Sequence, residues 1–234
     1  MPIGTQQTST SLSTGAGKKA CTQGTAGLLA GLLFLSGCSH IPAPSLDRPP
    51  QEYTPEQMAQ FKAHQQALEQ LTHWAVAARG AVRDSTQGGS FALRWEQSLD
   101  YSEVDLSGPF GQGQMYLAGT PEYMAIGYKL NHMRISTTPE RWIEENTGWP
   151  VPIAALPVWL IGQADPSAER EQIQINNAGL IVQQYADGWQ IRYDRYQTHN
   201  GLSLPGLIEV SRDDLRLRIL IDNWQIQCLK QPAL

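Results

Sequence analysis

Two pairs of adjacent carboxylates, Glu144-Glu145 and Asp213-Asp214, are the nearest approach to an acid–base site in this sequence. Neighbouring side chains diverge on a helix or a strand, so both pairs fit a solvated surface better than a catalytic centre. The histidines are not spaced as ligand pairs, and we expect them in solvent or at helix ends: His40, His64, His73, His132 and His199. Nucleophile-elbow, zinc-protease, paired-cysteine and phosphate-loop motifs are also missing from the sequence. We therefore expect no catalytic residue, no metal site and no enzyme activity.

The glycine-rich segment 108–113 lies between two expected strands and opens no helix, so it does not qualify as a dinucleotide-binding loop. Its centre, Pro109-Phe110-Gly111, places an aromatic side chain at the tip of a tight turn. An exposed aromatic residue lowers solubility unless something covers it. Two interpretations stay open: the loop folds back onto the core, or Phe110 is a wedge that enters lipid or a groove of a partner.

The N-terminal part of the sequence has the order of a secretory signal. Lys18 and Lys19 precede an apolar run from Ala26 to Leu35, and small residues follow it. The run is too short to span a bilayer, which takes about 20 apolar residues. We therefore expect residues 1–37 to be a signal peptide that is removed after export.

The end of this run, Leu35-Ser36-Gly37-Cys38, resembles the lipobox of bacterial lipoproteins. In those proteins the cysteine thiol takes a diacylglycerol, the chain is cut before the cysteine, and the new amine is acylated. The resemblance implies that Cys38 is the lipidation site and that its lipid is the only bound group. Ser39 in the next position resembles an outer-membrane address, because an aspartate there retains lipoproteins in the inner membrane. The alternative is a buried cysteine at the end of an ordinary helix.

The charge of the chain limits its partners. The leader holds two of the 17 basic residues and none of the 22 acidic ones, so the mature chain carries 15 basic and 22 acidic residues, a net charge of −7. With no basic stripe in the sequence, we expect no nucleic-acid partner and no electrostatic docking onto anionic lipid. Loss of Cys21 with the leader and acylation of Cys38 leave Cys228 without a disulfide partner, so we expect it to be a small buried residue on a strand.

Periodicity predicts the elements of the mature chain. Residues 38–53 are a proline- and serine-rich tether, and 54–234 form a single domain. Thr54-Pro55-Glu56-Gln57 is a capping box that starts an amphipathic helix ending near His73. A second helix starts at Thr138-Pro139-Glu140 and ends at Gly148, and residues 158–161 form a compact apolar turn.

The remaining segments alternate apolar and polar residues and are separated by glycine- and proline-rich breaks. They predict about ten or eleven antiparallel strands with one apolar face. The fold class is therefore mainly β, an unclosed antiparallel barrel with short helices as a plug or lid. Where the helices do not fill the concave side, an apolar cavity remains.

Four segments together resemble the LolB family of lipoprotein receptors: residues 108–111, 147–152, 159–162 and 216–224. The resemblance implies an unclosed β-barrel on the periplasmic side of the outer membrane, working as a monomer. It implies acceptance of the acyl chains of client lipoproteins from a LolA-like soluble carrier and their release into the outer membrane. It also implies that the loop of Pro109, Phe110 and Gly111 aids membrane insertion, although many members have an aliphatic residue at the position of Phe110.

Candidates for the acyl-chain cavity are the aromatic and methionine residues of the apolar faces: Trp95, Met115, Tyr116, Met124, Trp142, Trp149, Trp159 and Trp189. Ordinary core packing is the competing interpretation of each. Two other functions remain as alternatives. One is an assembly lipoprotein with a filled interior that binds a protein partner. The other is a tethered glycan hydrolase, for which the sequence offers no convergent carboxylates.

Overall fold

The computed structural model describes residues 52–111 and 113–226. The expected signal peptide, Cys38, most of the tether and Cys228 lie outside these residues, so the expectations for them stay predictions.

The described part begins with helix α1 (Pro55–Glu69). The Thr54 hydroxyl oxygen accepts a hydrogen bond from the Gln57 backbone N–H at 3.2 Å, and the Gln57 side chain accepts one from the Thr54 N–H at 2.9 Å, which confirms the predicted capping box. The expected end of this helix near His73 is wrong. His73 already pairs with Ser98 at the start of strand β1, so sheet pairing ends the helix at Glu69.

Eleven strands of the described residues form one antiparallel sheet in the order β6-β5-β4-β3-β2-β1-β13-β12-β9-β8-β7. Their bounds are β1 (His73–Arg83), β2 (Gly88–Ser98), β3 (Tyr101–Ser107), β4 (Met115–Thr120), β5 (Tyr123–Gly127), β6 (Arg134–Ser136), β7 (Gln174–Ile175), β8 (Ile181–Ala186), β9 (Trp189–Asp194), β12 (Leu207–Arg212) and β13 (Leu215–Ile226). The edge strands β6 and β7 do not pair with each other, so the sheet stays open. The predicted fold class, an unclosed antiparallel barrel with short helices, is confirmed.

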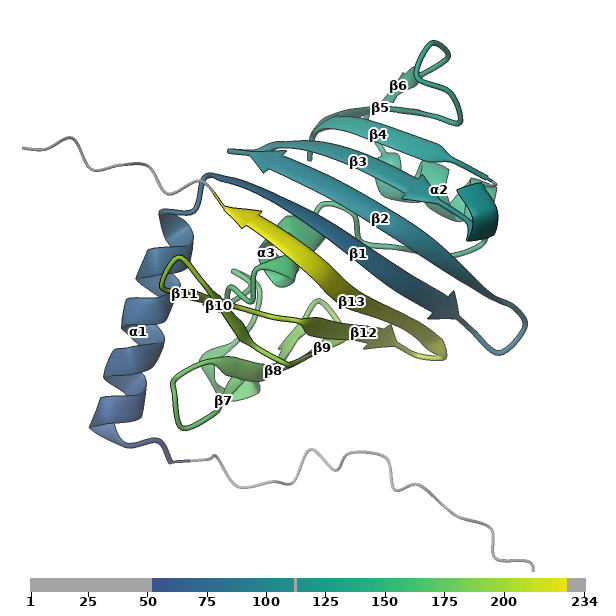
Figure 1. The fold of residues 1–234 in the computed structure, drawn as a ribbon. Coiled ribbons are helices and arrows are strands. Elements are labelled where there is room, and N and C mark those ends of the chain that lie inside the picture. Colours follow the sequence, from purple (N-terminus) through teal and green to yellow (C-terminus); the bar gives the residue numbers. More distant parts are fainter. Residues whose placement is uncertain (1–51, 112, 227–234) are drawn as a thin grey trace, which may run out of the picture. The chain divides into compact units, whose positions relative to one another are not determined.

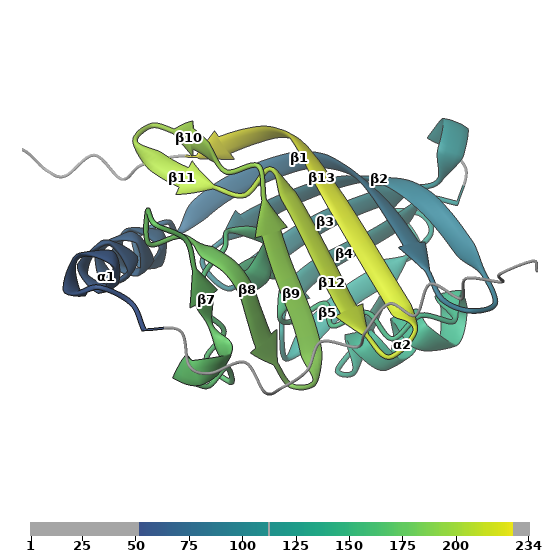
Figure 2. The ribbon, with the colours of Figure 1, turned by 90° about the horizontal axis from the view of Figure 1, so that it is seen from below.

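Strand alternation gives the sheet one apolar face. In β1, Trp74, Val76 and Ala78 are buried, and the residues between them are partly exposed. Helices α2 (Pro139–Thr147) and α3 (Leu156–Leu160) lie on one side of this sheet (Figure 1). The sheet itself is strongly curved when seen from below (Figure 2). No helix in the described part is both long and apolar enough to cross a bilayer.

Other details of the expected elements differ from the structure. Alternation of apolar and polar residues predicts separate strands at 215–221 and 224–228, but β13 runs without a break from Leu215 to Ile226 and pairs with both β1 and β12. The sequence reading also missed a small hairpin of β10 (Gln197–His199) and β11 (Leu202–Leu204). The second helix begins and ends where predicted, with Gly148 as a left-handed C-cap at φ 80°.

Candidate functional site

An apolar cavity of about 210 Å³ lies between the sheet and the segment that runs from α2 to α3. Strands β1–β4 and β13 form its floor, and α2, the following loop and the start of α3 form its cover. None of the described residues that line it is charged. Such a lining offers apolar contact over its whole surface and no ion-pairing group to a bound molecule.

Strand β2 supplies much of the floor through Phe91, Leu93 and Trp95, which share one face of the strand. Phe91 lies across Gly80 of the neighbouring strand: a Cβ atom at Gly80 would come within 2.1 Å of the Phe91 ring. Gly80 therefore makes room for the outer end of the Phe91 ring above the neighbouring strand. Trp95 is fully buried, and its indole N–H donates to the Gln97 side-chain oxygen at 2.8 Å.

The cover of the cavity is formed by Ile143 of α2 and by the loop that follows Gly148, with Trp149, Val151 and Ile153 facing inward. Most of the cover is therefore loop, joined to short helices at both ends. Connections of this kind open more readily than a sheet with a full ladder of backbone hydrogen bonds. The cover is thus the part of the wall best suited to move.

Side-chain hydrogen bonds fasten this cover to the β1–β2 turn, and one of them runs from the Gln87 amide to the Thr147 carbonyl at 3.5 Å. The Trp149 indole N–H donates to the Asp84 carboxylate at 2.9 Å, from the cover to the β1–β2 turn. The other Asp84 oxygen accepts hydrogen bonds from Thr86 N, Thr86 Oγ1 and Gln87 N. These donors, those of Thr86 above all, lower the pKa of Asp84 to about 2. Asp84 therefore stays ionised, and remains an acceptor for Trp149, down to acidic pH.

The rim of the cavity reaches the loop between β3 and β4. Ser107, Gly108 and Gly113 line the cavity, and a short 3₁₀ turn, η1 (Pro109–Gly111), extends from this rim. The Phe110 side chain is outside the described part of the structure. The backbone nevertheless shows that the turn predicted to carry Phe110 starts and ends at the cavity.

Only some of the residues predicted to line the cavity do so in the structure. Trp95, Met115 and Trp149 line the cavity. Met124 is buried on β5, and Trp142 packs half-buried against the core with its ring 5.7 Å from that of Tyr128.

Tyr116 lies on the opposite face of the sheet from the cavity. It lines an outer groove of about 580 Å³ together with Ala75, Ala77 and Ala118. Its neighbour Met115 points inward, and consecutive strand residues point to opposite faces. The prediction that Tyr116 lines the cavity is therefore wrong, because its side chain lies on the outer face of the sheet.

Trp159 and Trp189 fill the other half of the interior, with ring centroids 6.2 Å apart. The Trp159 indole N–H donates to Asp165 at 2.6 Å, and the Asp165 backbone N–H donates to Gln184 at 2.9 Å. The Gln184 amide in turn donates to the Tyr193 hydroxyl at 2.7 Å, and burial raises the Tyr193 pKa. This half of the curved sheet is a packed core.

Several residues that line the cavity were not predicted from the sequence, including Val82, Phe91, Leu106, Val151 and Ile153. Phe91 has the same strand parity as Trp95, which is the signal that would have identified it. No comparable signal marks Val151 and Ile153, because they belong to an irregular loop.

Comparison with known proteins places the chain among outer-membrane lipoproteins. A family model described as outer membrane lipoprotein LolB matches residues 72–224. The outer-membrane lipoprotein LolB of Alkalilimnicola ehrlichii is 32% identical over 204 residues, 85% of this chain and 96% of that protein. LolB of Nitrosococcus oceani is 30% identical over 199 residues, covering 85% and 96%. A solved LolA superfamily protein from Nitrosomonas europaea superposes with a TM-score of 0.49 at 8% identity, over 74% of this chain and 94% of that one.

Proposed function

The chain belongs to the LolB family of outer-membrane lipoproteins, and from this we propose how it works: it accepts acylated lipoproteins from a LolA-like periplasmic carrier and inserts them into the outer membrane. Its role is that of the outer-membrane receptor in lipoprotein sorting. In this proposal a lipid on Cys38 anchors the chain after residues 1–37 are removed, residues 38–53 are the tether, and residues 54–234 work as one domain.

The observation that carries the proposal is the uncharged cavity under β1–β4. Acyl chains form no hydrogen bonds, so a receptor for them needs apolar contact rather than matched polar groups. Each CH₂ removed from water contributes about 0.8 kcal/mol, and three long chains therefore represent tens of kcal/mol. A carrier, a receptor and a bilayer that bind the chains with successively higher affinity move them without a covalent step. We accordingly propose a monomer that is not an enzyme and needs no metal or cofactor besides its own lipid.

The size of the cavity indicates that its cover moves during acceptance. Pockets for small-molecule ligands typically enclose about 300–1,000 Å³, and an engineered apolar cavity of about 150 Å³ holds one benzene. At about 210 Å³ the cavity admits part of one acyl chain. We propose that the loop of Trp149, Val151 and Ile153 swings outward to admit the rest, since it is the least regular part of the wall.

Delivery is proposed to use the loop at the rim. Because Gly108 and Gly113 both line the cavity, the turn between them lies where an acyl chain would leave it. The apolar residue Phe110, with Pro109 and Gly111, would enter the bilayer and give the chain a continuous apolar route.

A transfer assay tests acceptance and delivery separately. A LolA-like carrier is loaded with an acylated lipoprotein, the lipidated receptor is added, and transfer to the receptor and then to vesicles is measured. Leu106→Trp fills the cavity from a half-buried position on β3 and should abolish acceptance. Leu99→Trp, at an exposed turn, is the matched control and should accept cargo normally.

Phe110→Glu addresses the second step. It should accept cargo and deliver it slowly, because a carboxylate resists entry into lipid. Normal acceptance by Leu106→Trp would overturn the cavity assignment, whereas normal delivery by Phe110→Glu would overturn only the loop assignment.

A further inference from the structure

The hairpin formed by β5, β6 and their connection exposes several apolar side chains. Leu130 is 69% exposed and Ile135 79%, and Tyr128 is 49% exposed. Isolated exposed apolar residues are common on proteins. Here three of them fall within eight residues of one short hairpin at the edge of the sheet, which concentrates them on a single projection. Such a local concentration is typical of a contact surface.

This hairpin is also basic, although the chain as a whole is acidic. No aspartate or glutamate occurs between Glu122 and Glu140, and the stretch between them contains Lys129, His132 and Arg134. All three basic residues are exposed. None of the ion pairs formed within residues 52–226 uses Lys129 or Arg134, so both charges are directed to solvent.

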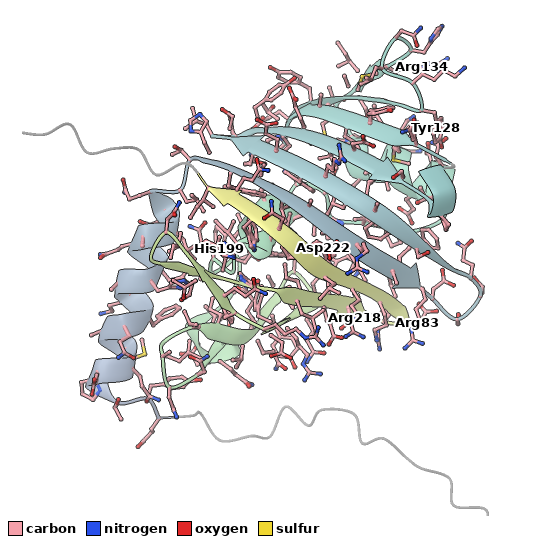
Figure 3. All side chains as sticks on the ribbon, in the orientation of Figure 1. Arg83, Tyr128, Arg134, His199, Arg218 and Asp222 are labelled. Atoms are coloured by element: carbon pink, nitrogen blue, oxygen red, sulfur yellow. The ribbon has the colours of Figure 1, made fainter. Side chains whose placement is uncertain are left out.

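Strand register places the hairpin beside the rim of the cavity. Tyr116 pairs with Gly127 and Leu106 with Met115, so the β3–β4 loop and the β5–β6 connection leave the same end of the sheet. The Tyr128 hydroxyl lies 3.5 Å from the Asn146 side chain of α2, which joins the hairpin to the cover of the cavity. Figure 3 shows Tyr128 and Arg134 at this end of the molecule.

We infer that residues 128–135 are a second membrane-contacting element, which binds the surface of an anionic bilayer next to the β3–β4 loop. Leu130 and Ile135 enter the boundary of the acyl region, and Tyr128 lies at the headgroup level, where its ring is apolar and its hydroxyl is hydrated. Lys129 and Arg134 bind lipid phosphates. Aliphatic residues flanked by unpaired cations match the chemistry of a lipid interface. A protein located at the outer membrane lies close to such an interface. The inference rests on this location and not on the cavity.

The two cations lie within eight residues, so the net charge of the whole chain does not indicate that this surface is locally basic. The net charge of −7 expected for the mature chain argues against a general attraction to anionic lipid, but surface potentials decay within about 10 Å at ordinary ionic strength. A local group of basic residues therefore acts on a bilayer that it touches, whatever the charge of distant parts of the chain.

The test places an environment-sensitive fluorophore on position 130 of the full lipidated protein in vesicles of phosphatidylethanolamine and phosphatidylglycerol. The label is attached to Leu130→Cys in a Cys228→Ser background, and lipids with spin labels at known depths serve as quenchers. Leu99→Cys is the matched control, because Leu99 is 66% exposed and lies in the β2–β3 turn at the opposite end of the sheet. We expect a blue shift and lipid quenching at position 130, and neither at position 99. Equal signals at both positions would overturn the proposal.

A second variant tests the basic residues. Each cation near an anionic surface is worth about 1 kcal/mol, which is about a fivefold change in the ratio of inserted to free hairpin. Lys129→Gln with Arg134→Gln should lower this ratio about 25-fold on anionic vesicles and leave it unchanged on neutral ones. Cargo acceptance from the carrier should stay normal, which separates this result from a failure of the receptor function. A blue shift that requires the carrier protein rather than vesicles would assign the hairpin to a protein partner and refute membrane binding.

Discussion

At the scale of single residues, we expect the hydrogen bond from Trp149 to Asp84 to govern how firmly the cavity is closed. It joins a turn of the sheet to the loop that covers the cavity, and no backbone ladder duplicates it there. An indole N–H needs an acceptor when it is half-buried, and a carboxylate is the strongest one a side chain offers.

We predict that Asp84→Ala speeds amide hydrogen exchange over residues 147–153. Asp100→Ala, at the β2–β3 turn, is the control and should leave that loop unchanged. Exchange measured against pH provides a second check. The folded pKa of Asp84 is lowered to about 2, so its contribution is complete above the unfolded value near 4 and is lost as pH falls toward 2. A loop equally protected at pH 2 and pH 5 would contradict this role.

At the scale of elements, helix α1 is held by close backbone packing and by polar contacts. Gly179 in the β7–β8 turn has φ 71°, and a Cβ there would lie 2.4 Å from the Phe61 backbone nitrogen. Gln57 donates to Asn177 at 3.1 Å and His64 contacts the Ser203 carbonyl at 2.8 Å. Helix α1 is thus fixed to one edge of the sheet.

Gly179→Ala should loosen α1 and lower stability. A left-handed alanine costs about 1–2 kcal/mol, and overlap with the α1 backbone adds about 1–3 kcal/mol. Gly201→Ala is the control, since Gly201 has φ 83° with no atom within 4 Å and should show the first cost alone. Urea unfolding measures both variants. Equal loss of stability would mean that α1 does not pack on Gly179 in solution.

At the scale of the whole molecule, the interior has a filled half and a hollow half. Around β8, β9 and α3, Trp159, Trp189 and Gln184 occupy the space. The Trp159 indole donates to Asp165, and the Gln184 side chain bonds to Asp165 and Tyr193. Under β1–β4 the cavity remains. We expect the packed half to hold the sheet in place while the proposed movement of the cover opens the other half.

An acyl ligand that binds the hollow half must raise the melting temperature. At a concentration of 100 times its Kd, a ligand that binds only the folded state adds about 2.7 kcal/mol, which is about 5–11 °C for a domain of this size. We predict such a rise with a long-chain fatty acid for the native protein and for Leu99→Trp, and none for Leu106→Trp. An equal rise in all three would place the ligand outside the cavity.

Helix caps and strand faces could be predicted from the sequence, because they depend on residues that are close together along the chain. The capping box at Thr54, the left-handed Gly148 and the inward parity of Trp95 and Met115 follow from spacing alone, and the structure confirms each. Together with the segments shared with the family, they determined the fold class and the kind of protein. The expected lipid on Cys38 also follows from local sequence and stays a prediction.

Only the tertiary structure decided where the interior is hollow. Periodicity assigns a side chain to a face but not to a depth, so Trp95 and Trp189 looked alike although one lines the cavity and the other fills a core. A cavity is the volume left when strands and loops distant in the sequence pack together, and no short segment encodes it. The basic, apolar hairpin beside the rim likewise became visible only when strand register placed it there.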